Sequence, residues 1–398
     1  MQNRGFVRTA RGLLFPALVF IAATLATSAW CRQATIEGRR WLLGSGPDAV
    51  AVIEVWGTPH EMGYAHGRLV KGELRTYYET FFNVIKKEMS VKDEQLDAAW
   101  AVMSKHIAPE FKEEMRGLAE GGGVPLKWVH WMHIIPDLSW LPPFHYQCSY
   151  YAAWGKAVPD GHLYQMRALD YWMEAHVQDK PAIILFRPNK GNAFATASWI
   201  GALGVISGMN AKGIAISEIG DGFGAEHETM DAEPWVFMAR RVLQYTDSLD
   251  SAVILIRGAR RMSSYDFLIG DGKAKDARQL VTAKDIFKQY DWKTAPHDQP
   301  VLEDVVYLSM AVGNTEYNRK LYQRLKANYG KLTAQIAMTD LMPRVETGDL
   351  HAVAFDVTDL KMWVANAEGS SPAYSRPSVV FDLRSALQQP VSRSRAAD

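Results

Sequence analysis

Cysteine is scarce in this sequence, which has 398 residues and only two cysteines, Cys31 and Cys148. Cys31 stands directly after an apolar N-terminal stretch, so Cys148 has at most one possible disulfide partner in the chain. An unpaired thiol in an oxidising compartment risks intermolecular pairing. Two interpretations of Cys148 are therefore open: a buried inert residue that fills apolar volume, or a reactive nucleophile.

Net charge is also absent. Lys and Arg together number 44, and Asp and Glu together number 44, which gives a formal net charge of zero. A chain with balanced charges has no overall field for binding nucleic acid or an anionic membrane surface. We therefore expect a small or neutral ligand and no nucleic-acid partner. Hydrophobic residues make up 48% of the chain, which suffices for a large core in one big domain or two ordinary ones.

The N-terminus has the order of a secretory signal. Three arginines lie in the first 11 residues, an uncharged apolar run covers residues 12–30, and small residues precede Trp30. This order predicts a signal peptide over residues 1–30 and export to the periplasm or the extracellular space. The alternative is an uncleaved membrane anchor, because the run approaches the roughly 20 residues that span a bilayer. The bulky Trp30 before Cys31 argues against lipidation.

Apolar periodicity changes from helical to strand-like at Cys148. Hairpin turns follow this point, with Asp160-Gly161 and Asn210 to Gly213 at the positions that need a positive φ. The polar stretch 286–301 is expected to be a surface loop. The elements predicted before Cys148 are a buried strand at 49–57 and helices at 58–89, 94–119 and 127–133.

Hairpins combined with helical pairs indicate an α+β fold. We expect two packed antiparallel sheets with helices outside them, preceded by a mostly helical region, and not a doubly wound parallel sheet. The strand at 148–157 and the strand at 163–171 form one of the predicted hairpins.

Cys148 stands at the start of its predicted strand, directly after the loop "LPPFHYQ". If the Gln147-Cys148 peptide is strained there, the thiol can attack the Gln147 carbonyl, take the acyl group onto sulfur and let water release a new N-terminus. The freed α-amine of Cys148 then has a reference pKa of about 7.7–8.0, which suits a general base. One residue would supply both the nucleophile and the base.

Several motifs around Cys148 resemble the autoproteolytic N-terminal-nucleophile (Ntn) hydrolases of the peptidase C45 type. That group includes the acyl-coenzyme A:6-aminopenicillanic acid acyltransferases, with choloylglycine hydrolases and acid ceramidases as more distant relatives. The resemblance covers nearly the whole mature chain in order and spacing. The motifs that carry it are "EMGYAHGRLVKGEL", "EEMRGLAEGGGVP", Cys148 itself, "RALD", "GMNAKGIAISE" and "VGNTEYNRKLYQRL".

The resemblance implies a role for each matching residue. Cys148 would be the nucleophile, and Arg167 and Asp170 of "RALD" would hold its thiol and free amine. Asn210 would donate to the developing oxyanion, and Asn314 would orient the substrate or the amine. The alternatives without catalysis are a cross-strand salt bridge for the first pair and plain turn chemistry for Asn210. Gln147 departs from the small or acidic residue that the family has before its nucleophile.

Two further patterns favour other sites only weakly. His145 lies three residues before Cys148, and side chains at odd spacing in a strand face opposite sides, so a Cys-His dyad is not expected. His130 and His133 share a helical face, but no further ligand lies at suitable spacing, so we expect structural histidines. No cofactor and no metal are predicted.

The sequence therefore predicts an exported Ntn hydrolase with an αββα sandwich that cuts itself between Gln147 and Cys148. Residues 31–147 would form the α chain and residues 148–398 the β chain. The processed enzyme would cleave a small-molecule amide, or transfer its acyl group, through a thioester on Cys148. The alternatives are a lipid-directed amidase of the phospholipase B-like kind and a non-catalytic, uncut binding protein on the same scaffold.

Overall fold

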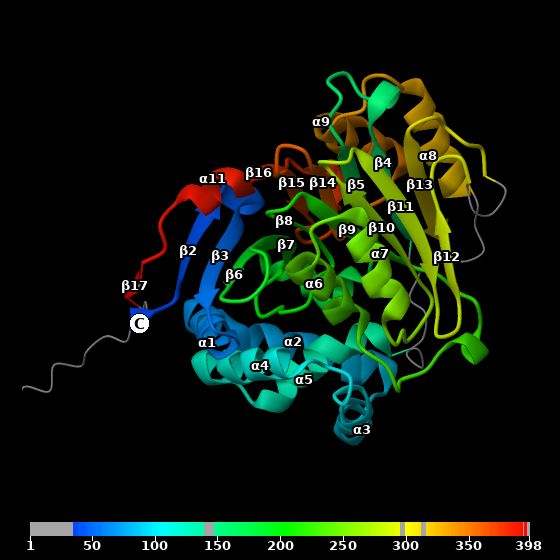
Figure 1. Ribbon diagram of the computed structural model, residues 1–398. Coiled ribbons are helices and arrows are strands. Elements are labelled where there is room, and N and C mark those ends of the chain that lie inside the picture. Colours follow the sequence, from blue (N-terminus) through cyan, green and yellow to red (C-terminus); the bar gives the residue numbers. More distant parts are fainter. Residues whose placement is uncertain (1–34, 139–146, 295–298, 312–315, 393, 396–398) are drawn as a thin grey trace, which may run out of the picture. The chain divides into compact units, whose positions relative to one another are not determined.

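Two β-sheets pack face to face between two layers of helices (Figure 1). The computed structural model describes residues 35–138, 147–294, 299–311, 316–392 and 394–395. Strands β4 (Gln147–Ala153) and β5 (Tyr164–Leu169) of one sheet lie against β9 (Ile214–Gly220) of the other. The expected α+β architecture, two packed sheets with outer helices, is confirmed.

The larger sheet has nine strands in the order β12-β11-β10-β9-β8-β7-β6-β3-β2. All its neighbouring pairs are antiparallel except β3 and β6, which are parallel. Its other strands are β2 (Gly38–Leu43), β3 (Val50–Gly57), β6 (Pro181–Pro188), β7 (Phe194–Trp199), β8 (Ser207–Asn210), β10 (Tyr265–Asp271), β11 (Asp276–Thr282) and β12 (Phe287–Tyr290).

The smaller sheet has six antiparallel strands in the order β13-β4-β5-β14-β15-β16, so the strand that begins with Gln147 and Cys148 lies inside it. Its remaining strands are β13 (Val305–Ala311), β14 (His351–Asp356), β15 (Lys361–Asn366) and β16 (Val379–Asp382). The short strands β1 (Thr35–Ile36) and β17 (Ser394–Arg395) pair with each other.

Helices cover the outer face of each sheet. The nine-stranded sheet is covered by α1 (Pro59–Leu69), α6 (Trp235–Tyr245) and α7 (Leu249–Gly258), and α4 (Pro109–Gly122) packs on α1. The six-stranded sheet is covered by α8 (Glu316–Ala327) and α9 (Ala334–Ile336). The other helices are α2 (Lys71–Met89), α3 (Asp93–Met103), α5 (Leu126–Ile134), α10 (Met342–Val345) and α11 (Leu383–Gln388).

The chain reverses sharply from β3 into α1. The apolar, β-branched residues of β3 are buried on both faces, as a strand inside a covered sheet requires. Thr58 caps α1: its backbone N–H donates to the Glu61 carboxylate over 2.9 Å, and its hydroxyl accepts from the Glu61 backbone N–H. Pro59 follows at the first helical position, where its missing N–H costs nothing. The predicted strand at 49–57 and the helix start at Thr58 are confirmed.

Glycines allow α1 and α4 to lie in backbone contact. A Cβ atom on Gly63 would lie 2.0 Å from the carbonyl oxygen of Glu114, and one on Gly117 would lie 2.3 Å from that of His60. Both separations are far inside van der Waals contact. The glycines of the motifs "EMGYAHGRL" and "RGLAEGG" therefore have a packing function at this helix crossing.

Four sequence predictions need correction. The predicted helix at 94–119 is two helices, α3 and α4, which residues 104–108 separate. The predicted helix at 58–89 is broken at Val70 into α1 and α2. The stretch 286–301, predicted as a loop, contains β12 at the edge of the nine-stranded sheet. The region before Cys148 is mostly helical, but it also contributes β2 and β3 to that sheet, and the pair β3–β6 is parallel rather than antiparallel.

Within the described residues, no helix combines the length and apolar character that a bilayer crossing requires.

Candidate active site

Cys148 is the second residue of β4, held between two neighbouring strands. It pairs in register with Leu169 of β5 on one side and with Met310 of β13 on the other. The residue is only 5% exposed. Burial raises the pKa of its thiol to about 12, although the guanidinium of Arg167 and the backbone N–H of Asp170 both lower it. In the continuous chain the sulfur is therefore a neutral thiol with a cation and a backbone donor beside it.

Arg167 connects the two sheets. Its Nε donates to the backbone carbonyl of Glu218 over 3.0 Å, and its Nη2 donates to the Glu218 carboxylate over 3.2 Å. Arg167 lies on β5 and Glu218 on β9, and both side chains are at most 5% exposed. Burial raises the pKa of Glu218 to about 7, and Arg167 opposes that rise. The third guanidinium nitrogen, Nη1, has no hydrogen-bond partner among the described residues.

Asp170 follows directly after β5 and is held by the loop before β14. Its Oδ1 accepts from the backbone N–H groups of Gly348 (2.6 Å) and Asp349 (2.7 Å), and its Oδ2 accepts from the Thr347 hydroxyl (2.8 Å). Burial and the charge of Asp349 raise the pKa of Asp170 to about 8, against the effect of these three donors. The carboxyl group is thus fixed in direction and titrates near neutral pH.

The structure brings three of the predicted site residues together. Cys148, Arg167 and Asp170 lie at the paired ends of β4 and β5, and the pKa of the Cys148 thiol responds to both other groups. Gln147 begins β4, so the peptide proposed for self-cleavage lies at the start of this strand. Asn314 and His145 lie outside the described residues.

Asn210 is engaged elsewhere. Its amide nitrogen donates to the carbonyls of Leu243 (2.8 Å) and Thr246 (2.9 Å) at the end of α6. Its side-chain oxygen accepts from the backbone N–H groups of Lys212 and Ile214, each over 3.0 Å. Both amide N–H donors therefore have acceptors already, and the side chain closes the turn between β8 and β9. The oxyanion role stays a prediction, and these bonds give Asn210 the alternative role, that of a turn residue.

Glu218 was not predicted as a residue of this site, although it ends the motif "GMNAKGIAISE". A signal was present: Glu218 is the only charged residue in the run "IAISEI", whose other side chains predict a buried strand. A carboxylate in a buried strand needs a partner, and the sequence alone did not tell which cation from another sheet supplies it.

Hydrogen-bond acceptors gather on the same face of β4 as Cys148. Tyr150, two residues further along, is fully buried, and its hydroxyl has no partner among the described residues. Burial, with the charges of Asp266, Asp221 and Glu218, raises the pKa of Tyr150 well above its ordinary value. This part of the interior is thus rich in carboxyl groups and contains one unpaired hydroxyl.

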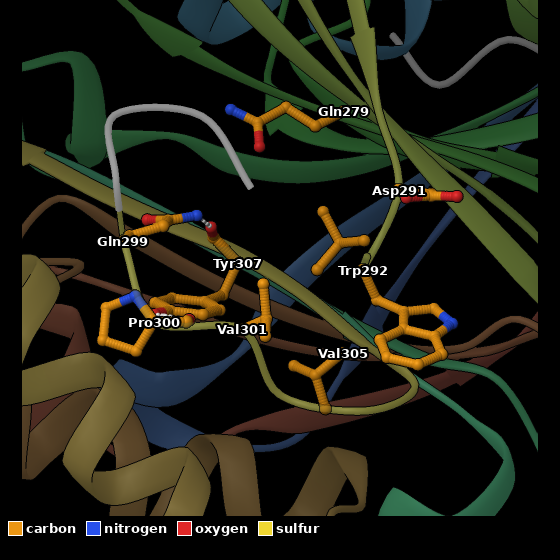
Figure 2. Close-up of a pocket in the computed structure, with 9 residues that line it drawn as sticks. Gln279, Asp291, Trp292, Gln299, Pro300, Val301, Val305 and Tyr307 are labelled. Carbon is orange, nitrogen blue, oxygen red and sulfur yellow. Dashed lines mark hydrogen bonds between the residues drawn. The ribbon is translucent and has the colours of Figure 1, made fainter. Parts of the chain in front are cut away.

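The small cavity in Figure 2 lies at another place, between the loop after β12 and strand β13. Its volume of about 10 Å³ is at the lower limit for holding one water molecule. Asn318 and Gln299 are linked beside it, with the Asn318 amide donating to the Gln299 oxygen over 2.6 Å. The cavity is too small for an amide substrate. Its lining residues are Gln279, Asp291, Trp292, Gln299, Pro300, Val301, Val305, Val306 and Tyr307.

Metal ligands do not gather at Cys148 in the described part of the chain. His162, Asp356 and Asp359 have ligand atoms within 4.8 Å of one another, but they lie at the far ends of β5 and β14 from Cys148. The His162 ring is already 2.9 Å from the Asp356 carboxylate. His133 accepts from the Leu203 backbone N–H, and the His130 ring stacks on Trp100 at a centroid distance of 3.7 Å. Both therefore have the structural roles that the sequence favoured.

Comparison with known proteins gives distant relatives. No family model matches the chain. Protein dcd1B of Dictyostelium discoideum is 24% identical over 393 residues, which cover 88% of this chain and 77% of that protein. Protein dcd1A of the same organism is 25% identical over 406 residues, 89% of this chain and 90% of that protein. An uncharacterized protein of Archaeoglobus fulgidus is 26% identical over 258 residues, 56% of this chain and 42% of that protein.

Solved structures give fainter likenesses. An N-acylethanolamine-hydrolyzing acid amidase ortholog of Caenorhabditis elegans has a TM-score of 0.44, 16% identity and coverage of 59% of this chain and 100% of its own. A mutant conjugated bile acid hydrolase from Clostridium perfringens has a TM-score of 0.43 and 10% identity, and the match covers 62% of this chain and 96% of that chain. Penicillin V acylase from Agrobacterium tumefaciens has a TM-score of 0.40 and 9% identity, and the match covers 60% of this chain and 86% of that chain. With TM-scores below 0.5, these likenesses carry no argument about what this chain does.

Proposed function

We propose that this protein is an autoproteolytic Ntn amidohydrolase of the peptidase C45 type, with Cys148 as its nucleophile. The observation that carries the proposal is the position of Cys148 beside two groups that the motif resemblance pairs with it. Whereas burial and the charges of Glu218 and Asp170 raise the pKa of the thiol, a buried cation, Arg167, lowers it, and so does the backbone N–H of Asp170. A cysteine that only filled apolar volume would need neither.

Self-cleavage would be the first reaction. The Cys148 sulfur adds to the Gln147 carbonyl carbon, the bond from that carbon to the Cys148 nitrogen breaks, and the nitrogen takes a proton to become the α-amine. The Gln147 acyl group is then a thioester on Cys148. Water adds to this thioester, the Gln147 carboxylate leaves, and the thiol is regenerated. Asp170, fixed by three donors next to β4, is the anion that would hold the new α-ammonium.

Turnover of a substrate would repeat the same bond changes on an external amide. The Cys148 α-amine takes the thiol proton, the sulfur attacks the substrate carbonyl, and the amine product leaves with that proton. Water then releases the acid. We expect water rather than an amine as the acceptor, because we also propose export through the N-terminal signal, and coenzyme A thioesters are not plausible outside the cytoplasm.

The buried groups beside Cys148 bear on the substrate. Tyr150 brings an unpaired hydroxyl next to Asp221, Asp266 and Glu218. Burial raises the pKa of Asp266 and of Glu218, so a further negative charge placed there would carry an uncompensated desolvation cost. We therefore propose a neutral or amine-bearing amide.

The test is to trap the acyl-enzyme. Purified protein is mixed with aminocoumarin amides that share one acyl chain, with a neutral, an ammonium or a carboxylate group at its end, then quenched in acid. We expect the acyl mass on the peptide that begins at Cys148, release of the trapped acyl group by hydroxylamine, and least turnover for the carboxylate probe. The Cys148→Ala variant should show none of this, and the matched Cys31→Ala variant should behave as the wild type. Equal hydrolysis by wild type and Cys148→Ala would overturn the proposal.

A further inference from the structure

A chain of buried hydroxyl groups leads to Asp170 from the face of the six-stranded sheet opposite to Cys148. The hydroxyls of Ser309 and Ser149 are 2.6 Å apart, and those of Ser149 and Thr347 are 2.8 Å apart. Thr347 then donates to Asp170 Oδ2 over 2.8 Å. Each of these three hydroxyl residues is at most 2% exposed. Water therefore does not replace these bonds.

The direction of the hydrogen bonds along this row of hydroxyls follows from the number of protons. A hydroxyl has one hydrogen, and an ionised Asp170 can only accept, so Thr347 gives its hydrogen to the Asp170 carboxylate. Ser149 must then donate to Thr347, and Ser309 must donate to Ser149. All three O–H dipoles thus point toward the Asp170 carboxylate, and aligned hydroxyls strengthen one another.

The register of the strands explains how this row of hydroxyls reaches Asp170. Ser149 follows Cys148 in β4, so the two side chains lie on opposite faces of the sheet. Ser309 of β13 pairs directly with Ser149, and Thr347 lies in the loop that enters β14. The nucleophile is thus on one face, and the support for its neighbour Asp170 is on the other.

Asp170 needs this support because its surroundings oppose a negative charge. It is 5% exposed, and the Asp349 carboxyl lies beside it. The charge of Asp170 in turn raises the pKa of two neighbouring titratable groups, Cys148 and Tyr374. The donors that face it are Thr347 and two backbone N–H groups.

We propose that Thr347, oriented by Ser149 and Ser309, is a positioning residue that favours the ionised form of Asp170 and directs its carboxylate at the nitrogen of Cys148. The proposal rests on the proposed function, because the α-amine of Cys148 exists only after self-cleavage. It assigns a task to three residues outside the motifs of the sequence.

The test compares Thr347→Val, which removes the donor at nearly constant volume, with Thr347→Ser, which keeps it. Thr347→Val removes a hydrogen bond to a charged group, so the pKa of Asp170 should rise. The fall of kcat/KM on the acid side of its pH profile, the acid limb, should then lie about one pH unit higher. Thr347→Ser should return the limb toward its wild-type position. Asp349→Asn removes the neighbouring charge and should move the limb the opposite way. Thr196→Val is the matched control, because this fully buried hydroxyl donates to the neutral carbonyl of Ser207 over 2.9 Å. It should leave the limb in place.

A second measurement does not depend on amidase activity. In the uncut Cys148→Ala chain, the unfolding free energy is followed against pH for four proteins: the parent, Asp170→Asn, Thr347→Val and the double variant. Subtracting the unfolding free energy of the Asp170→Asn variant from that of its parent isolates the contribution of Asp170, once with Thr347 present and once with Thr347→Val. The pH dependence of each difference gives the pKa of Asp170 in the folded state. We expect a higher pKa without Thr347, whether or not an amide is ever hydrolysed. Equal pKa values with and without Thr347, or an unshifted acid limb in an active Thr347→Val enzyme, would overturn the inference.

Discussion

The guanidinium of Arg167 on β5 lies 3.2 Å from the carboxylate of Glu218 on β9, so an ion pair joins the two sheets beside Cys148. The two charges act on the thiol in opposite senses: Arg167 lowers the pKa of Cys148, and Glu218 raises it. Buried pairs of this kind contribute little net stability, because desolvation offsets the attraction. We infer that the pair sets the electrostatic potential at the Cys148 sulfur.

The first prediction concerns thiol reactivity. Glu218→Gln should lower the pH midpoint of Cys148 alkylation by iodoacetamide, because it removes a negative charge and leaves Arg167. Arg167→Met should raise that midpoint, because it removes the cation. Each shift should amount to about one pH unit. Shifts in the same direction for both variants would show that lost packing, not charge, is responsible.

The second prediction concerns stability against pH. Burial raises the pKa of Glu218 from 4.5 to about 7, so the folded state holds this proton more tightly than the unfolded chain does. The stability that the protonated group contributes is present below pH 4.5 and is lost as the pH rises through about 7. The unfolding free energy of the parent minus that of Glu218→Gln should therefore fall by up to about 3 kcal/mol between pH 4 and pH 8.

Urea unfolding checks this difference. Both proteins carry Cys148→Ala, which keeps the chain uncut. Asp170 titrates in the same range, with a pKa of about 8, but it is common to both proteins and cancels. A difference that stays constant over this range, or grows with pH, is incompatible with the raised pKa of Glu218.

The third prediction concerns the crossing of α1 and α4. Gly63→Ala places a Cβ atom 2.0 Å from the Glu114 carbonyl oxygen, so the helices must separate. We expect a loss of about 2 kcal/mol or more in unfolding free energy. Gly72→Ala on α2 is the matched control, since its Cβ meets nothing within 4 Å. It should be neutral or stabilising by up to about 1 kcal/mol. Similar losses in both variants would contradict the packing role of Gly63.

Local sequence patterns predicted the local structure well. The strand at 49–57, the start of α1 at Thr58 and the turns at Gly161 and Gly213, both with positive φ, are all confirmed. These features depend on a few neighbouring residues, whose propensities the sequence displays. The sequence also predicted that Arg167 and Asp170 would lie near Cys148, because a hairpin places them on the neighbouring strand.

Features that depend on distant segments were not predicted. The parallel pairing of β3 with β6 joins segments more than a hundred residues apart, and no local pattern encodes it. Glu218 was missed because its partner lies on another sheet. Thr347 and Ser309 were missed because single hydroxyl residues carry no sequence signal until a fold brings them together. β12 was mistaken for a loop because an edge strand tolerates the polar residues that also fill loops.

The most direct test of the account is the N-terminal sequence and intact mass of the purified protein, measured for the wild type and for Cys148→Ala beside an assay of amide hydrolysis. The account predicts two polypeptides in the wild type, one beginning at Cys148 with a free α-amine, and a single inactive chain in the variant. A wild-type preparation that hydrolyses amides while Cys148 remains inside an uncut chain would contradict it.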